Sequence, residues 1–150
     1  MLAANFLTAA ELHISEDLRD ALITILGRLE RGEFKAIDFA AQVKGLHIDG
    51  DLFAMNHWCT NSSCGTIRCI GGWAEEVMGR PLTRMVEGAF SFIEPTPPNL
   101  MHLFFPGQTA QTYATDADAA VALRNYLTTG NANWKEIVKR PVRIKEDVAA

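Results

Sequence analysis

The sequence predicts an all-α, or nearly all-α, fold: a compact bundle of five to seven short helices in one domain spanning residues 1–150. Apolar residues recur at helical spacing along most of the chain. The segments between these apolar patterns contain residues that commonly begin or end helices. With 48% hydrophobic and 21% charged residues in a chain of 150, a core can form without disulfides or a metal.

The clearest predicted helix follows Ser15, a good N-cap residue that precedes two carboxylates in the first turn. Gly32 ends this helix. Six apolar residues lie along one face of it: Leu18, Ala21, Leu22, Ile25, Leu26 and Leu29. A second, shorter helix is expected from Phe34 to about Val43. Residues 51–58 are expected to add two helical turns.

A central helix is predicted over Cys69–Met78, where apolar residues again share one face and Gly79 ends the helix. Ser63 or Thr66 is expected to cap its start. Two glycines lie inside it, and each costs about 1 kcal/mol relative to alanine. A helix that accommodates such residues usually has another backbone packed against it, so we expect this helix at the centre of the fold.

The next part of the chain is the least regular. Residues 83–93 are expected to form either a small two-stranded element or an irregular buried segment. Three prolines within 95–98 exclude a helix there. Asn99 is then expected to cap a short helix that ends at Phe105, and residues 108–114 are expected to form a polar loop.

The last long helix is predicted from a capping box, in which Thr115 precedes Asp118 by three residues. Gly130 ends this helix. Its inward residues are expected to be Ala119, Ala120, Leu123, Tyr126 and Leu127. Asn133 is expected to cap one or two final turns. Residues 1–13 and 141–150 are expected to be loosely held termini.

Composition excludes several functional classes. A formal charge of −4 disfavours nucleic-acid binding, because phosphate backbones repel an acidic protein. One basic cluster near the C-terminus is interpreted as a solvated helix face: Lys135, Lys139, Arg140, Arg143 and Lys145. No apolar run approaches the ~20 residues of a membrane span, and no secretion signal is recognisable. Three cysteines without such a signal favour a reducing, cytoplasmic location.

One segment combines residues that can carry chemistry: His57, Cys59, Cys64 and Cys69, with four residues between successive cysteines. Phe53–Trp58 reads Phe-x-Met-x-x-Trp, and Cys64–Ala74 reads Cys-Gly-Thr-x-x-Cys-Ile-x-Gly-Trp-Ala. Leu-Phe-Phe-Pro at 103–106 and Ala-Leu-Arg-Asn-Tyr-Leu-Thr-Thr-Gly at 122–130 follow. Over about residues 50–135 the chain thereby resembles a group of small bacterial and phage-associated proteins. This resemblance implies a shared fold and no particular activity.

Four interpretations of the cysteine segment remain open. The first is structural, because free cysteine behaves as a small apolar residue and Cys69 falls on the predicted buried stripe. The second is a zinc site formed by Cys59, Cys64, Cys69 and His57, which supplies four ligands but lacks the usual two paired knuckles.

The third interpretation is a reactive thiol. Cys64 would lie just before a helix N-terminus, where the thiol pKa is lowered, and His57 or His102 would serve as the base. The fourth is a disulfide that joins Cys64 to Cys59 or to Cys69, transient in a reducing compartment.

The sequence therefore supports two functional hypotheses. We expect a small cytoplasmic interaction or accessory module without catalytic activity or cofactor, which binds a protein partner or a second copy of itself. A bacterial, phage-related origin rests on the resemblance alone. The alternative is a thiol- or metal-dependent enzyme, with Cys64 and His57 as catalytic residues or zinc held by the cysteine cluster.

Overall fold

The computed structural model describes residues 5–34, 51–53, 60–62 and 65–139. It confirms the predicted fold class, since this part of the chain is mostly helical and carries a minor antiparallel hairpin. The helices are α1 (Ala9–Leu12), α2 (Glu16–Glu30), α4 (Ile70–Met78), α5 (Pro98–Phe104), α6 (Gln108–Tyr113), α7 (Asp116–Thr129) and α8 (Trp134–Ile137). The strands are β1 (Asp51–Phe53), β2 (Thr60–Ser62), β3 (Gly65–Arg68), β4 (Thr83–Val86) and β5 (Ala89–Phe92).

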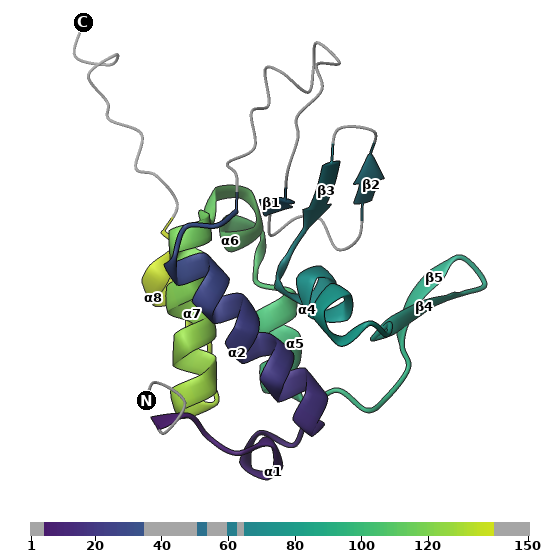
Figure 1. The fold of residues 1–150 in the computed structure, drawn as a ribbon, viewed down its shortest axis with the longest axis horizontal. Helices are drawn as coiled ribbons and strands as arrows, with labels where there is room; N and C mark the ends of the chain where they lie inside the picture. Colours follow the sequence, from purple (N-terminus) through teal and green to yellow (C-terminus); the bar gives the residue numbers. More distant parts are fainter. Residues whose placement is uncertain (1–4, 35–50, 54–59, 63–64, 140–150) are drawn as a thin grey trace, which may run out of the picture.

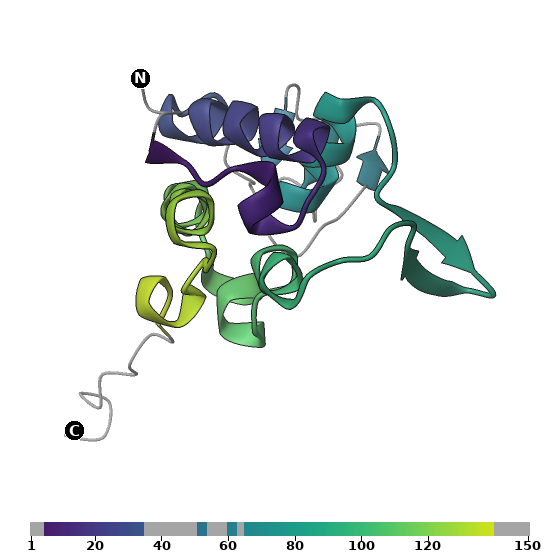
Figure 2. The same cartoon turned by 90° about the horizontal axis from the view of Figure 1, so that it is seen from below.

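Helix α2 lies at the centre of the molecule, between α7 on one side and α4 on the other (Figure 1). Seen from below, α2 and α4 lie above α5, α6, α7 and α8, so the helices form two layers (Figure 2). The hydrophobic core occupies the space between these layers. The predicted helix from Phe34 to Val43 falls almost entirely outside the described residues.

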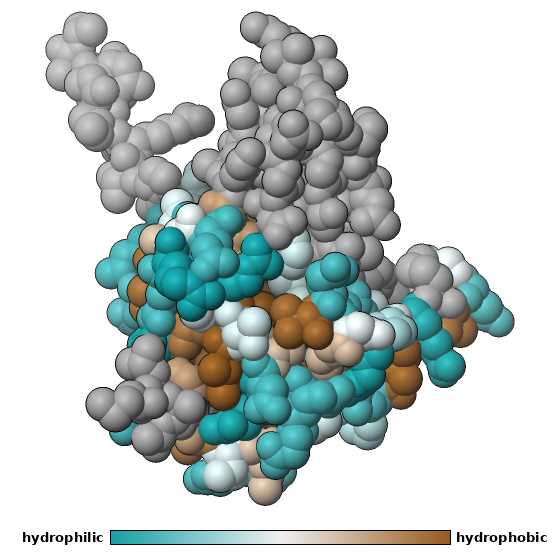
Figure 3. Space-filling view, viewed as in Figure 1, coloured by the Kyte–Doolittle hydropathy of each residue, from teal (hydrophilic) through white to brown (hydrophobic). Residues whose placement is uncertain are grey.

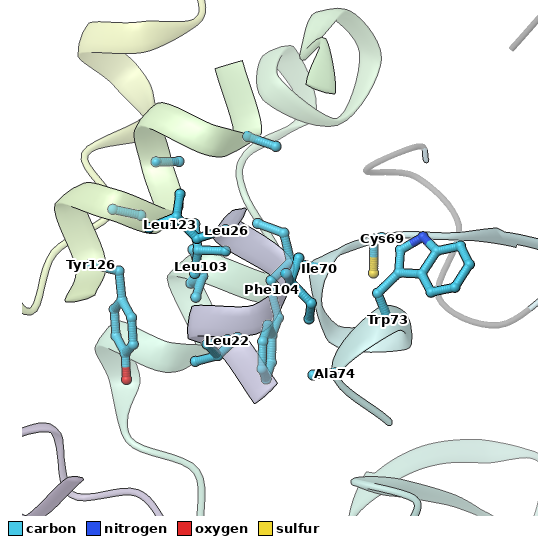
Figure 4. Close-up of a cluster of buried hydrophobic side chains, with 14 of the residues drawn as sticks. Leu22, Leu26, Cys69, Ile70, Trp73, Ala74, Leu103, Phe104, Leu123 and Tyr126 are labelled. Atoms are coloured by element: carbon cyan, nitrogen blue, oxygen red, sulfur yellow. The ribbon is translucent and has the colours of Figure 1, made fainter. Parts of the chain in front are cut away.

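The apolar stripes predicted for α2 and α7 are the two halves of this core. All six predicted residues of α2 are buried, and so are all five of α7. Leu22 and Leu26 from α2 meet Leu103, Phe104 and Leu123 from the opposite layer (Figure 4). Because each buried side chain of this size contributes roughly 1.5–3 kcal/mol, the α2–α7 contact is a main source of stability.

Helix α4 packs against α2 and α5 and buries its first five residues, but α2 and not α4 lies at the centre of the helices (Figure 1). Gly79 ends α4 in the left-handed conformation, with φ of 69°, as its sequence position indicated. The predicted caps were wrong: Cys69 is the N-cap, because Gly65–Arg68 forms strand β3 and not the lead-in to a helix.

The prediction of helical turns at residues 51–58 was also wrong where the structure describes them, because Asp51–Phe53 is strand β1. This strand pairs in parallel with β3, which also pairs antiparallel with β2. A short apolar run is ambiguous between helix and strand, and its partner in a sheet decides which one forms. That partner is distant in the sequence.

The predicted two-stranded element is confirmed as the antiparallel hairpin β4–β5. Its turn residues Glu87 and Gly88 both have positive φ, 51° and 79°, which matches the right-handed twist of a tight hairpin. The hairpin projects from the helical body (Figures 1 and 2).

Two predictions on the segment after the prolines needed correction. Helix α5 begins at Pro98 with Pro97 as N-cap, not at Asn99, because proline is well tolerated in the first helical turn. The predicted polar loop contains helix α6, Gln108–Tyr113. Its residue Ala110 is buried, so tertiary packing supplies the stability that the polar sequence lacks.

Both ends of the described chain are packed against the core. The capping box of Thr115 and Asp118 is present at α7, and Asn133 is the N-cap of α8. Residues 1–13 were expected to be loosely held, and the structure describes them from residue 5 onward. In this part Phe6 and Leu12 are buried, and the backbone N–H of Leu7 donates to the carbonyl of Leu127 at 2.7 Å. Residues 141–150 lie outside the described part.

Candidate functional site

A cavity of about 250 Å³ lies at the base of the hairpin, where the α1–α2 connection, the hairpin strands and α5 come together. We call it the hairpin-base cavity. Its lining residues are His13, Ile14, Ser15, Leu18, Leu82, Phe92, Glu94, Pro95, Thr96, Leu100 and Phe104. Sequence reasoning did not identify this site, because its residues come from four segments that meet only in the folded chain.

Apolar and polar residues both line the cavity. Leu18, Leu82 and Leu100 are 2–3% exposed and belong to the hydrophobic core. His13 is exposed, and Glu94 is partly exposed. This combination is typical of binding sites, in which apolar walls supply affinity and a few polar groups fix orientation.

Two backbone anchors hold the hairpin in position beside the cavity. The Glu75 carboxylate of α4 accepts hydrogen bonds from the backbone N–H groups of Leu82 and Thr83, at 2.6 and 3.1 Å. The N–H of Ile93 donates to the carbonyl of Leu82 at 2.9 Å and closes the base of the hairpin. The cavity wall is therefore fixed to α4.

An ionic network borders the cavity and joins the hairpin base to the start of α2. The Arg80 guanidinium donates from Nε and Nη2 to the two oxygens of Asp17, at 2.6 and 2.9 Å. Its Nη2 also donates to the Ser15 hydroxyl oxygen at 3.1 Å and to Glu94 at 3.3 Å. One guanidinium thus serves two carboxylates and a hydroxyl.

The charge of this network is negative overall, because Asp17 and Glu94 share a single cation. The hydrogen bonds from Arg80, aided by Ser15, hold the pKa of Asp17 well below its ordinary value. The same hydrogen bonds to Asp17, together with the Glu94 carboxylate, raise the pKa of Arg80. The stronger, bidentate contact belongs to Asp17, so the Glu94 carboxylate retains most of its capacity to attract a cation.

Two exposed apolar residues are sequence neighbours of lining residues. Ile93, between the lining residues Phe92 and Glu94, is 45% exposed. Phe105, next to Phe104, is 39% exposed and packs edge-on against Phe92 with ring centroids 5.9 Å apart. We call the cavity together with Ile93 and Phe105 the hairpin-base surface. Hydrophobic colouring extends onto the hairpin in the space-filling view (Figure 3).

The structure describes one residue of the predicted cysteine cluster, Cys69. Its side chain is 2% exposed and lies beside Trp73 at the start of α4 (Figure 4). Burial raises the pKa of the Cys69 thiol to about 11, which opposes both thiolate formation and nucleophilic reactivity. These properties fit the structural interpretation of Cys69.

His57, Cys59 and Cys64 lie outside the described residues, so the predicted zinc site and catalytic pair remain predictions. Within the ranges that the structure does describe, no group of three or more His, Cys, Asp or Glu residues is placed to hold a metal ion. One premise was wrong: Cys64 does not directly precede a helix, because strand β3 separates it from α4.

Comparison of the chain with protein-family models, with curated proteins and with solved structures found no match. Among the helices that the structure describes, none has the length and apolar character needed to cross a membrane.

Proposed function

We propose that this protein is a non-catalytic interaction module that binds a partner protein through the hairpin-base surface. The observation that carries this proposal is the hairpin-base cavity, together with exposed Phe105, whose ring packs against the lining residue Phe92. Apolar residues that gather around a cavity at the surface mark interaction sites, whereas single exposed ones do not.

The size of the cavity favours a protein partner over a free coenzyme or metabolite. Pockets that enclose drug-sized ligands are roughly 300–1,000 Å³, and this cavity is about 250 Å³. It is large enough for one anchoring side chain. Anchors of this kind, large apolar side chains that fill a pocket, contribute most of the binding energy of many interfaces.

The polar groups at the cavity are arranged for binding rather than for catalysis. The Ser15 hydroxyl oxygen accepts from Arg80 and is thereby part of the network that joins α2 to the hairpin base. The enzyme hypothesis rests on His57 and Cys64, to which Cys69 adds only a buried thiol. We also propose a reducing, cytoplasmic location, which the three cysteines favour.

Site-specific photo-crosslinking in cells of the source organism tests the proposal. A photoreactive phenylalanine analogue replaces Ile93 in one variant and Val121, on the exposed side of α7, in the other. The two positions are a matched pair, 45% and 50% exposed. We expect a discrete crosslinked product from position 93 alone, whose mass distinguishes a second copy from another protein. Identical products at both positions, or none at 93, would contradict the proposal.

A further inference from the structure

We propose that the hairpin-base cavity accepts a large apolar side chain of the partner protein that is adjacent to a lysine or arginine, and that Glu94 is the anionic contact for that basic residue. This inference deepens the proposed function and rests on it. It is carried by the position of Glu94 in the cavity lining and by the charge balance of the network around Arg80.

The apolar part of the partner follows from the cavity walls. Leu18, Leu82, Leu100 and Phe104 form the apolar part of the lining, and each is at most 3% exposed. Phe92 adds an aromatic face, stacked on Phe104 with centroids 6.5 Å apart. A large apolar side chain fills such a space, whereas a polar one would lose its hydrogen bonds to water.

The charged part follows from the edge of the cavity. Glu94 is the acidic residue of the lining, and its contact with Arg80 is a single one of 3.3 Å. Arg80 directs its bidentate pair to Asp17, which leaves one excess negative charge in the network. Arg80 is not available to bind an anionic ligand, because it already pairs with the carboxylates of Asp17 and Glu94. A partner cation is complementary to this edge.

Two blocked tetrapeptides that differ in one charge test the inference. Ala-Phe-Lys-Ala and Ala-Phe-Glu-Ala are titrated into methyl-labelled protein, with the NMR signals of Leu82 and Leu100 as readout. We expect the lysine peptide to bind about tenfold more tightly, because attraction to Glu94 replaces repulsion. Glu94→Gln should reduce this preference to about twofold or less. Equal binding of the two peptides, or tighter binding of the glutamate peptide, would overturn the inference.

Two control variants make the readout specific. Glu30→Gln removes a carboxylate of similar exposure that pairs with Arg124 away from the cavity, and it should leave the preference intact. His13→Asn removes the other ionisable lining residue, in the left-handed conformation that asparagine tolerates, and should also leave it intact. Loss of the preference in either variant would refute the assignment to Glu94.

A third probe separates the sources of the ligand. Free 2-phenylethylammonium carries an aromatic ring and a cation without a peptide backbone. Binding as tight as that of the lysine peptide would overturn the assignment to a protein partner. A crosslink at Ile93 combined with equal binding of the two peptides would support the docking surface and refute the claim that Glu94 binds a basic residue of the partner. The two proposals can therefore fail separately.

Discussion

Replacement of Arg80 by glutamine should loosen the connection between α2 and the hairpin base. Arg80 and Asp17 form two hydrogen bonds of 2.6 and 2.9 Å. Opposite charges about 4 Å apart attract by roughly 4 kcal/mol at an effective dielectric constant near 20. The side chains are 35% and 49% exposed, however, so solvent screening and lost side-chain entropy reduce the net contribution to about 1 kcal/mol.

A double-mutant cycle of Arg80→Gln and Asp17→Asn, measured by urea unfolding, should therefore give a coupling energy of about 1 kcal/mol. The pair of Arg124 and Glu30 is a matched control, with bonds of 2.9 and 2.6 Å and exposures of 33% and 34%. It lacks the further contacts that Arg80 makes with Ser15 and Glu94. Arg124 also lies over the Phe6 ring, 5.6 Å from its centroid, so we expect Arg80→Gln and Arg124→Gln to lower the free energy of unfolding by similar amounts.

The lowered pKa of Asp17 determines how pH changes the stabilisation that the Arg80–Asp17 pair gives to the fold. A carboxyl group whose pKa is lower in the folded state stabilises the fold fully above its unfolded pKa, near 4. This stabilisation is lost as the pH falls below that value. The difference in stability between the parent protein and Arg80→Gln should therefore narrow below about pH 4. A coupling energy of zero, or a difference independent of pH down to acid unfolding, would refute the reasoning.

Three further predictions concern the core. Leu22→Ala, at a fully buried position of α2, should lower the free energy of unfolding by about 2–5 kcal/mol. Val121→Ala, on the exposed surface of α7, should change it by about 0.5 kcal/mol or less. Equal effects of the two substitutions in urea unfolding would contradict the described core. The Tyr126 hydroxyl is buried without a hydrogen-bond partner among the described residues, so Tyr126→Phe should keep or raise the melting temperature, and a marked fall would reveal a missing contact. Cys69, with a thiol pKa of about 11, should resist iodoacetamide at pH 8 until urea unfolds the protein, and peptide mass spectrometry would detect any earlier modification.

Local patterns were sufficient to predict the long helices. In α2 and α7 the apolar residues, the caps and the terminal glycines all indicate the same boundaries, so burial of Leu22 and Leu123 follows from spacing alone. Strand β1 could not be predicted in this way, because its pairing with β3 is set by residues far along the chain. Helix α6 was missed because its polar sequence depends on packing at Ala110.

The candidate site depended even more on the tertiary fold. Ser15 was recognised only as a helix cap, and Glu94 and Arg80 carried no motif. The network joins residues 63 and 65 positions apart, a distance over which periodicity carries no information. One signal was available: two acidic residues in the first turn of α2 indicated a negative surface there. The residue types that attracted attention, His57 and the cysteines, contributed only Cys69 to the described structure.

Hydrogen exchange of the purified complex with the crosslinked partner tests the central claim most directly. If the hairpin-base surface is the docking site, amide protection on binding should increase at Leu82 and across Phe92–Thr96, and the amides of α7 around Val121 should be unchanged. Protection centred on α7, with the hairpin base exchanging as in the free protein, would contradict the assignment of this surface as the interaction site.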